Sequence, residues 1–326
     1  MKNLRIISVF LFFLLAVTAA SAQAQDAHLL AESELSGPVS RMVWNEAGNT
    51  IMLASREAVE YIELSAPKDS KSCSLSVKDP FFTALSQTGI AVSTDWQTIS
   101  IFDPGKDEKA VRTIDPGFMV LSVGISKDGS LVLADSAEQI RTVVYNTEDG
   151  SVVYDLTGFE TAAPVYDSSF SADSSYLVWH ARGTLAVQNI AEGTFGKTIS
   201  LWDFIADYEL SPDNSTLAAA IINDDYENGC VIFFDPENGQ ELGRTILGKT
   251  SPNHLSYSAD GTVLWASDAA TVYRIDPVSF ELHAQYPVTS PDAESERISL
   301  IASAPDGSSA AVLLNSGKVF LVESEK

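Results

Sequence analysis

Positive charge is scarce in this chain. Of its 326 residues, 20 are Lys or Arg and 44 are Asp or Glu, which gives a formal net charge of -24. Proteins that bind nucleic acid neutralise phosphates with clustered Lys and Arg, and the sequence contains no such cluster. The field of so acidic a molecule repels DNA, RNA and anionic lipid. We therefore expect no nucleic-acid partner, and we interpret the acidity as a source of solubility rather than as a specific cation-binding feature.

Cysteine is almost absent, since Cys73 and Cys230 are the only two. Two cysteines do not make a disulfide framework. In the repeat assignment below they fall in the first and fifth repeats, which are not neighbours, and a disulfide requires Cα atoms within about 7 Å of each other. We expect two unpaired, buried thiols.

Histidine is also rare, and the sequence has no catalytic or metal-binding motif. A nucleophilic triad needs a histidine between a nucleophile and an acid, but no motif surrounds any of the four histidines, and no His or Cys pair has the spacing of a zinc site. The haem attachment sequence Cys-x-x-Cys-His is missing as well. The acidic stretches 103–108 and 223–228 could offer oxygen ligands to calcium, yet they lack the regular spacing of a calcium loop. We expect no catalytic residue, metal or cofactor, and interpret these stretches as solvated loops.

The one long apolar run, residues 6–16, follows two basic residues and precedes a series of small residues. This is the layout of a secretory signal peptide. A membrane-spanning helix needs roughly 20 apolar residues, so the run is short for an anchor, although an uncleaved tether is the alternative. We predict that residues 1–24 are a signal peptide cleaved after Ala22 or Ala24, and that the product is secreted or periplasmic.

Seven copies of a turn similar to Ser-x-Asp-Gly divide the rest of the chain. They end at positions 48, 89, 129, 174, 214, 261 and 307, so that successive copies lie 40 to 47 residues apart. This spacing is close to the roughly 40 to 45 residues of a four-stranded propeller blade. The copies are Asn45-Glu46-Ala47-Gly48, Ser86-Gln87-Thr88-Gly89, Ser126-Lys127-Asp128-Gly129, Ser171-Ala172-Asp173-Ser174, Ser211-Pro212-Asp213-Asn214, Ser258-Ala259-Asp260-Gly261 and Ala304-Pro305-Asp306-Gly307.

The residues around each turn fit a blade of four short strands. Asp and Asn bond their own backbone in tight turns, and Gly or Asn tolerates the left-handed conformation there. An apolar strand follows each turn, and a later strand ends in an apolar residue followed by an acid or amide, as at Phe102-Asp103, Tyr145-Asn146, Phe234-Asp235 and Ile275-Asp276. These pairs stand where WD repeats carry Trp-Asp. The chain thus resembles the degenerate WD-repeat propellers of exported bacterial proteins over nearly its whole mature length. It departs from them in lacking the Gly-His element, and its one Trp-Asp pair, Trp202-Asp203, falls in an outer-strand or inter-blade position.

The ends of the chain predict how the ring closes. The seventh repeat has only three strands, at 298–302, 310–314 and 318–322, whereas His28 to Leu35 reads as a strand that precedes the first repeat. Pairing this strand into the last blade removes an open edge. We therefore predict an all-β fold: residues 25–326 form one seven-bladed β-propeller of four-stranded antiparallel blades, closed by the N-terminal strand.

The loops between the second and third strands of each blade are the candidate binding surface. We expect Trp44, Trp179 and Trp265, which lie on strands, to pack between blades, whereas Trp96 lies in a loop. Loops also collect polar residues without any function, but Trp, Tyr and Arg most often anchor interfaces. The candidate binding residues in these loops, on the face opposite the Ser-x-Asp-Gly turns, are Arg56, Trp96, His180, Arg182, Tyr226 and Asp268.

Three functions fit such a chain. The first is a non-enzymatic, monomeric scaffold that binds a protein or peptide through one loop face and has no stable membrane anchor. The second is an exported propeller enzyme of the lactonase-like or quinone-cofactor type, which should gather several His, Glu, Asp or Arg side chains at one mouth of the channel. The third is a component of envelope assembly.

Overall fold

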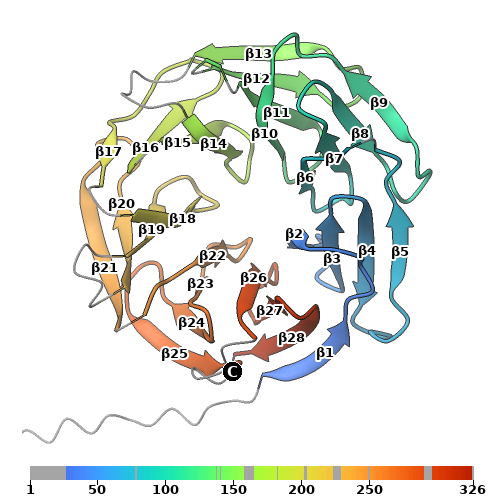
Figure 1. Ribbon diagram of the computed structural model, residues 1–326. Helices are drawn as coiled ribbons and strands as arrows, with labels where there is room; N and C mark the ends of the chain where they lie inside the picture. The colour runs from blue at the N-terminus through green and yellow to red at the C-terminus, as the bar shows by residue number, and fades with distance from the viewer. Residues whose placement is uncertain are drawn as a thin grey trace, which may run out of the picture.

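Seven four-stranded antiparallel sheets are arranged in a ring around a central axis, as predicted (Figure 1). The structure is a computed structural model, and it describes residues 27–77, 79–136, 138–139, 141–157, 165–181, 183–201, 204–222, 229–248, 250–289 and 296–324. No helix occurs among these residues, and the described part of the chain therefore contains no helix that could span a membrane.

Six blades are formed by four consecutive strands and the seventh by the last three strands with the N-terminal strand, and in each blade the first strand named lies nearest the axis. Blades 1 to 3 consist of β2 (Val39–Trp44), β3 (Thr50–Ser55), β4 (Ala58–Glu63) and β5 (Lys71–Ser74); β6 (Phe82–Leu85), β7 (Ala91–Thr94), β8 (Ile99–Phe102) and β9 (Ala110–Ile114); and β10 (Val120–Ile125), β11 (Leu131–Ser136), β12 (Arg141–Asn146) and β13 (Val152–Thr157). Blades 4 and 5 consist of β14 (Val165–Phe170), β15 (Tyr176–Ala181), β16 (Thr184–Asn189) and β17 (Ile199–Ser200); and β18 (Phe204–Leu210), β19 (Leu217–Ile222), β20 (Gly229–Phe234) and β21 (Glu241–Gly248). Blades 6 and 7 consist of β22 (His254–Tyr257), β23 (Leu264–Ser267), β24 (Thr271–Ile275) and β25 (Leu282–Pro287); and β26 (Ile298–Ser303), β27 (Ser309–Leu314), β28 (Lys318–Glu323) and β1 (His28–Glu32).

The repeated turns join the first and second strands of the blades, and their side chains do what the sequence predicts. In blade 3 the Ser126 hydroxyl donates to Asp128 Oδ1 at 2.6 Å, and the same oxygen accepts the Ser130 N–H at 3.0 Å. Gly129 takes the left-handed conformation, with φ of 76°. Because the carboxylate bonds its own turn, the sequence motif specifies a tight hairpin locally.

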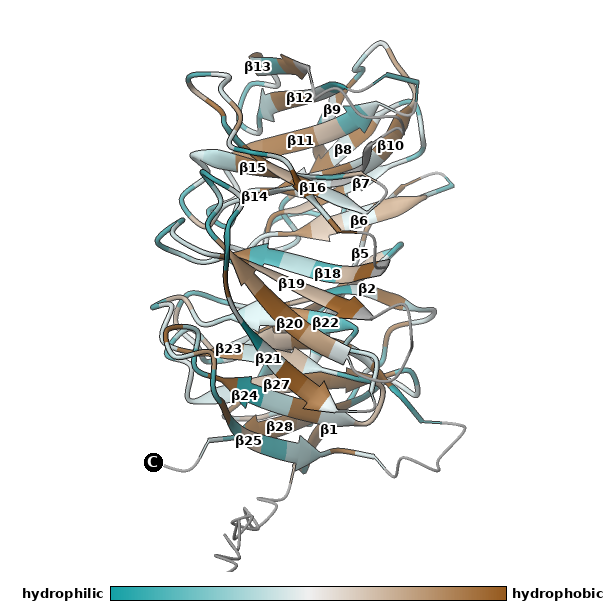
Figure 2. Ribbon diagram, turned by 90° about the vertical axis from the view of Figure 1, so that its left-hand side faces the viewer, coloured by the Kyte–Doolittle hydropathy of each residue, from teal (hydrophilic) through white to brown (hydrophobic). Residues whose placement is uncertain are grey.

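Burial decreases from the middle of a blade to its outer edge. All six residues of β20 and of β27 are buried, whereas in β25 every second residue is exposed and the others are half-buried or, at Tyr286, buried. Figure 2 shows the same contrast in hydropathy. The middle strands are covered by neighbouring blades on both faces, so they are mostly apolar, while the outer strands face water on one side.

The three strand tryptophans pack between blades as predicted. Trp44, Trp179 and Trp265 are at most 2% exposed. Trp44 of blade 1 donates its indole N–H to the carbonyl of Ala302 in blade 7 at 2.9 Å, and so couples two neighbouring blades. The Trp202-Asp203 pair lies outside the described residues.

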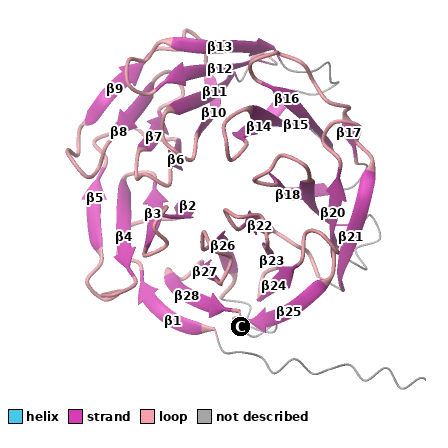
Figure 3. Cartoon of the chain, turned by 180° about the vertical axis from the view of Figure 1, so that it is seen from behind, coloured by secondary structure: helices cyan, strands magenta, loops and turns pink. Residues whose placement is uncertain are grey.

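The N-terminal strand closes the ring, which confirms the predicted closure (Figure 3). β1 pairs antiparallel with β28, with His28 opposite Leu321 and Glu32 opposite Lys318. The strand ends at Glu32, three residues earlier than predicted. The segment that follows is held by the buried side chain of Glu60, which accepts the hydroxyl of Ser33 and the backbone N–H of Glu34.

The cysteines lie in blades 1 and 5, as expected. Cys73 on β5 is free but only half-buried, so the prediction that it would be buried is wrong. The outermost strand of a blade is solvated on one side, and this leaves the thiol partly open. Cys230 on β20 is fully buried.

Candidate functional site

Four of the six predicted binding residues can be placed on the described part of the chain. Arg56, Trp96 and Asp268 lie between the second and third strands of blades 1, 2 and 6, and His180 lies near the end of the second strand of blade 4. Arg182 and Tyr226 lie outside the described residues. The ring separates the blades that carry His180 and Asp268 from the neighbouring blades 1 and 2 (Figure 1). Only Arg56 and Trp96 meet, and they do so around a residue that the sequence analysis did not select.

That residue is Phe81, and with Arg56 and Trp96 it forms what we call the Trp96 cluster. The Phe81 and Trp96 rings stack with their centroids 3.5 Å apart and their planes 28° from parallel. The exposed guanidinium of Arg56 lies 5.9 Å from the centroid of the Phe81 ring, within the range of a cation–π contact. Phe81 belongs to the connection between blades 1 and 2, so the cluster spans the junction of these blades. Both rings are half-buried.

The backbone holds the Trp96 ring in place. Trp96 has a φ of 77°, a conformation that costs energy for a bulky residue and persists only where neighbouring contacts impose it. Its carbonyl accepts the N–H of Val120 from blade 3 at 2.8 Å. The Phe81 N–H donates to the carbonyl of Thr94, just before this loop, at 2.7 Å.

Asp95 fixes the rest of the Trp96 loop. Its Oδ1 accepts the N–H groups of Gln97 and Thr98 at 3.1 and 2.7 Å and the Thr98 hydroxyl at 2.9 Å. Burial raises the pKa of this carboxyl, but the hydrogen bonds outweigh burial and leave its pKa below the usual value. The loop is therefore a closed turn that presents Trp96 in one orientation.

The other two placed residues contribute to structure. Asp268 is only 8% exposed, and its carboxylate accepts the N–H groups of Ala270 and Thr271 and the hydroxyls of Thr250 and Tyr273. His180 is half-buried, and its ring lies edge-on to the Tyr208 ring of blade 5 at 5.4 Å between centroids. We therefore leave both outside the candidate binding surface.

The channel carries charged side chains that the sequence analysis did not assign to it. Asp207 and Glu209 lie two residues apart on β18, the innermost strand of blade 5. The Leu255 N–H of blade 6 donates to Asp207 Oδ2 at 2.8 Å, and the Tyr257 N–H donates to Glu209 Oε2 at 2.8 Å. These bonds join the innermost strands of blades 5 and 6.

Burial changes the ionisation of both carboxyls. It raises the pKa of Asp207 to about 7, against the opposing effects of the backbone hydrogen bonds and of the nearby Arg41 guanidinium. Burial also raises the pKa of Glu209, while the Lys127 ammonium and the Tyr257 N–H favour its charged form. Arg41 and Lys127 come from blades 1 and 3, so groups of opposite charge influence each other in the channel.

An enzyme on this scaffold should gather several His, Glu, Asp or Arg side chains at one mouth of the channel. Within the described ranges, no group of three or more His, Cys, Asp or Glu side chains is placed to hold a metal ion. His254 and His283 share blade 6 but lie on its innermost and outermost strands, and burial lowers the pKa of His254. His28 and His180 lie in blades 7 and 4. Acidic and basic groups lie near one another in the channel without a direct ion pair among the described residues, and Asp207 and Glu209 each accept backbone N–H groups.

No protein-family model matches the chain, and no curated protein matches it in sequence. Solved structures do match its fold. One is "Kuenenia stuttgartiensis Hydrazine Synthase", with a TM-score of 0.69 and 15% identity over 90% of this chain and 97% of that chain. Another is the β-propeller domain of Cps50 (Swd1) from Myceliophteria thermophila, a WD40 propeller, with a TM-score of 0.70 and 14% identity over 92% of this chain and all of that one. The chain thus shares its seven-bladed fold with an enzyme chain and with a WD40 propeller, and at these identities the likeness concerns the fold alone.

Proposed function

We propose that this protein is an exported, non-enzymatic β-propeller scaffold that binds a protein or peptide through the face that carries the Trp96 cluster. The observation that supports this proposal is the stacked pair of Phe81 and Trp96, held half-exposed beside the exposed guanidinium of Arg56. Trp and Arg side chains in a preformed arrangement are frequent anchors of protein interfaces. A rigid anchor also loses little conformational entropy when a partner binds.

The strain at Trp96 supports the same interpretation. A left-handed Trp costs on the order of 1–3 kcal/mol, a cost that glycine would not have in the same conformation. Trp96 is partly solvent-accessible, so its ring contributes less to burial than the buried tryptophans do. Binding of a partner to the cluster would account for a strained, accessible aromatic residue at this position.

A random peptide display library selected on the immobilised mature protein tests the proposal. Peptides enriched on the wild type should bind the Trp96→Ala, Arg56→Ala variant at least about tenfold more weakly, since losing an anchor costs about 1.4 kcal/mol or more. The matched control is Glu46→Ala, an exposed change in the blade 1 turn on the opposite face. Peptides that bind the double variant as tightly as the wild type, or that lose affinity only with Glu46→Ala, would exclude the cluster as the binding site.

Export is tested separately. Mass spectrometry of the mature protein from the native host should find an N-terminus near Gln23 or Gln25, because the start of the chain has the layout of a cleaved signal. An intact Met1 on the accumulated protein would contradict export by this route.

A further inference from the structure

The central channel contains two cavities that share part of their wall. One has a volume of about 210 Å³ and is lined by residues of blades 1 to 4, among them Arg41, Phe82 and Lys127. The other has a volume of about 140 Å³ and lies where Lys127, Glu209 and Tyr257 approach from blades 3, 5 and 6. Lys127 lines both cavities, so the two spaces meet at this side chain.

The cationic groups of this wall, the exposed Arg41 and the half-buried Lys127, have few protein partners. Neither Arg41 nor Lys127 has an ion-pair partner within 4.0 Å among the residues that the structure describes. Within the described ranges, Arg41 donates only to the carbonyl of its neighbour Ser40, at 3.1 Å, and its guanidinium lies 5.0 Å from the centroid of the Phe82 ring. A guanidinium has five N–H donors and an ammonium has three, so most of these donors remain available.

A buried hydroxyl adds a further donor. Tyr257 is 4% exposed and lines the smaller cavity, and its hydroxyl has no hydrogen-bond partner within the described part of the chain. A buried polar atom without a partner costs free energy, and such an atom calls for a ligand, an ion or a water.

The acceptors of the channel, by contrast, are largely occupied. Asp207 accepts the N–H groups of Tyr208 and Leu255, and Glu209 accepts that of Tyr257. The channel therefore has more free hydrogen-bond donors than free acceptors. This is so although the overall charge of the molecule is strongly negative.

We propose that the channel binds a small organic anion that carries carboxylate or phosphate oxygens, held by Arg41 and Lys127. An oxyanion satisfies the free donors of both cations with charge-assisted hydrogen bonds. The Phe82 ring beneath Arg41 provides an apolar face for the carbon skeleton of the ligand. The cavities are smaller than a typical drug-sized pocket of about 300–1,000 Å³, which favours a compact ligand. This site is separate from the Trp96 cluster and does not depend on the proposed peptide binding.

Isothermal titration calorimetry of the mature protein with phosphate, succinate and citrate, at low and constant ionic strength, tests the proposal. At least one of these anions should bind, and Arg41→Gln and Lys127→Gln should each weaken its binding about tenfold, the usual effect of removing one charge-assisted bond. Lys127→Arg should restore most of the affinity. The matched control is Lys71→Gln, which removes one positive charge from an 80% exposed side chain on β5.

The outcomes distinguish specific anion binding in the channel from nonspecific electrostatic attraction of anions to the protein. Thermal melts show whether each variant is folded. The fold should tolerate replacement of Arg41 and Lys127, because neither side chain is fully buried. The proposal is overturned if none of the three anions binds at up to about 10 mM, or if Lys71→Gln weakens binding as much as the channel variants do. Trp96→Ala should leave anion binding unchanged, so failure of the peptide proposal and failure of the anion proposal are distinguishable.

Discussion

Carboxylates that accept hydrogen bonds from the neighbouring blade lie where one blade meets the next. Asp135 of blade 3 accepts hydrogen bonds from Ser122 and Thr142 of its own blade and from the Ser168 backbone N–H and hydroxyl of blade 4. Asp207 and Glu209 connect blades 5 and 6 in the same way. Adjacent innermost strands in a propeller are too far apart for a backbone ladder, so side-chain acceptors satisfy N–H groups that would otherwise be unpaired.

Replacing Asp135 should destabilise the protein strongly. Asp135→Ala removes the shared acceptor from four donors in a site that is 1% exposed, and leaving buried donors unpaired costs on the order of 3 kcal/mol or more. The measurement is the free energy of unfolding from a urea titration. The matched control is Asp128→Ala in the same blade, where the carboxylate also accepts several hydrogen bonds but is exposed to water. A loss no larger for Asp135→Ala than for Asp128→Ala would contradict the role of burial.

Asp207 should make the stability depend on pH in an identifiable direction. Its pKa is about 7 in the folded protein and about 3.9 in an unfolded chain, so between these values the folded state holds a proton that the unfolded state releases. Stability therefore falls as the pH rises from about 4 to about 7 and then levels off for this group. Asp207→Asn retains an acceptor for the Leu255 N–H without the charge, so it should raise the melting temperature at pH 8.

The comparison across pH provides the control for Asp207→Asn. At pH 5 the wild-type carboxyl is protonated and neutral, so the variant and the wild type should melt at nearly the same temperature. A difference in melting temperature that stays constant from pH 5 to pH 8 would show that Asp207 does not titrate in this range.

Among the structural elements, the repeated turns and apolar strands could be predicted because their signals are local. A turn motif with its own hydrogen bonds specifies a hairpin wherever it occurs. The channel residues could not be predicted in this way. A β-bulge interrupts the register between Ile205 and Asp207, and another does so between Val39 and Arg41. One extra residue shifts the alternation of side chains, so strict counting from the strand end assigns these residues to the wrong face.

The candidate site was predictable only in part, for a similar reason. Trp96 and Arg56 stand out as rare residue types in loops. Phe81 belongs to a connection between blades, and it meets Trp96 because its N–H extends the pairing of β6 with the end of β7 at Thr94. The aromatic pair Phe81-Phe82, where the connection runs into β6, is the one local signal that could have identified it.

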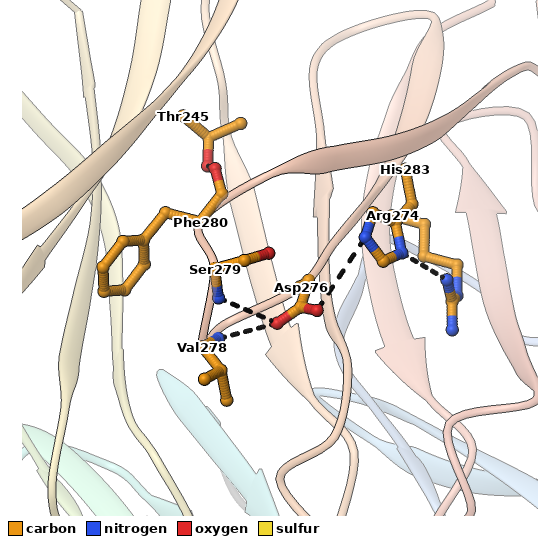
Figure 4. A network of polar contacts seen from close by, with 7 residues as sticks. All are labelled: Thr245, Arg274, Asp276, Val278, Ser279, Phe280 and His283. Atoms are coloured by element: carbon orange, nitrogen blue, oxygen red, sulfur yellow. Dashed lines mark hydrogen bonds and ion pairs between the residues drawn. The ribbon is translucent and has the colours of Figure 1, made fainter.

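The turn between β24 and β25 of blade 6 contacts blade 5 (Figure 4). Asp276 caps this turn by accepting the N–H groups of Val278 and Ser279. Phe280, with a φ of 61°, accepts the Thr245 hydroxyl of blade 5 at its carbonyl. Its ring packs 4.7 Å from that of Phe233 in blade 5. Phe280 therefore makes both of these contacts between blades 5 and 6, one through its carbonyl and one through its ring.

Gly243 and Phe280 should be energetically coupled. A Cβ on Gly243 would lie 2.2 Å from Cδ2 of Phe280, so Gly243→Ala should cost about 1–3 kcal/mol through overpacking. Phe280→Ala should cost about 2 kcal/mol for a half-buried ring. Once the ring is gone the alanine at 243 has space, so the double variant should lose about 1 kcal/mol less than the two single variants together. Urea titrations of the four proteins measure this, and strict additivity would mean that the ring and the glycine do not interact.

At the scale of the whole molecule, the ring depends on joining the two ends of the chain. Six blades are formed by consecutive strands, and blade 7 alone takes its outer strand from the other end of the chain. The sequence predicted this closure because the last repeat was one strand short. It did not predict that Glu60, on the third strand of blade 1, would hold the segment after β1. That contact depends on how blade 1 packs beside blade 7.

Deleting residues 26–36 should therefore open the ring. The deletion removes the pairing of β1 with β28, exposes the edge of β28, and leaves the buried Glu60 carboxylate without Ser33 and Glu34 as donors. An unpaired charge in a site that is 0% exposed is costly, and an open strand edge favours association with other chains. We expect the melting temperature to fall by about 10 °C or more, since a few kcal/mol correspond to that shift in a domain of this size, and light scattering should show aggregation at the transition.

A second change separates the two contributions to closure. Glu60→Gln without the deletion keeps β1 and retains an acceptor for Ser33 and Glu34, so it should lower the melting temperature less than the deletion does. In the deletion background the same change should be stabilising, because it removes the charge that the deletion leaves buried and unpaired. If the variant that lacks residues 26–36 melted at the same temperature as the protein that retains them, the N-terminal strand would not be needed to close the ring. If Glu60→Gln failed to improve the deleted protein, the loss would come from the strand edge alone.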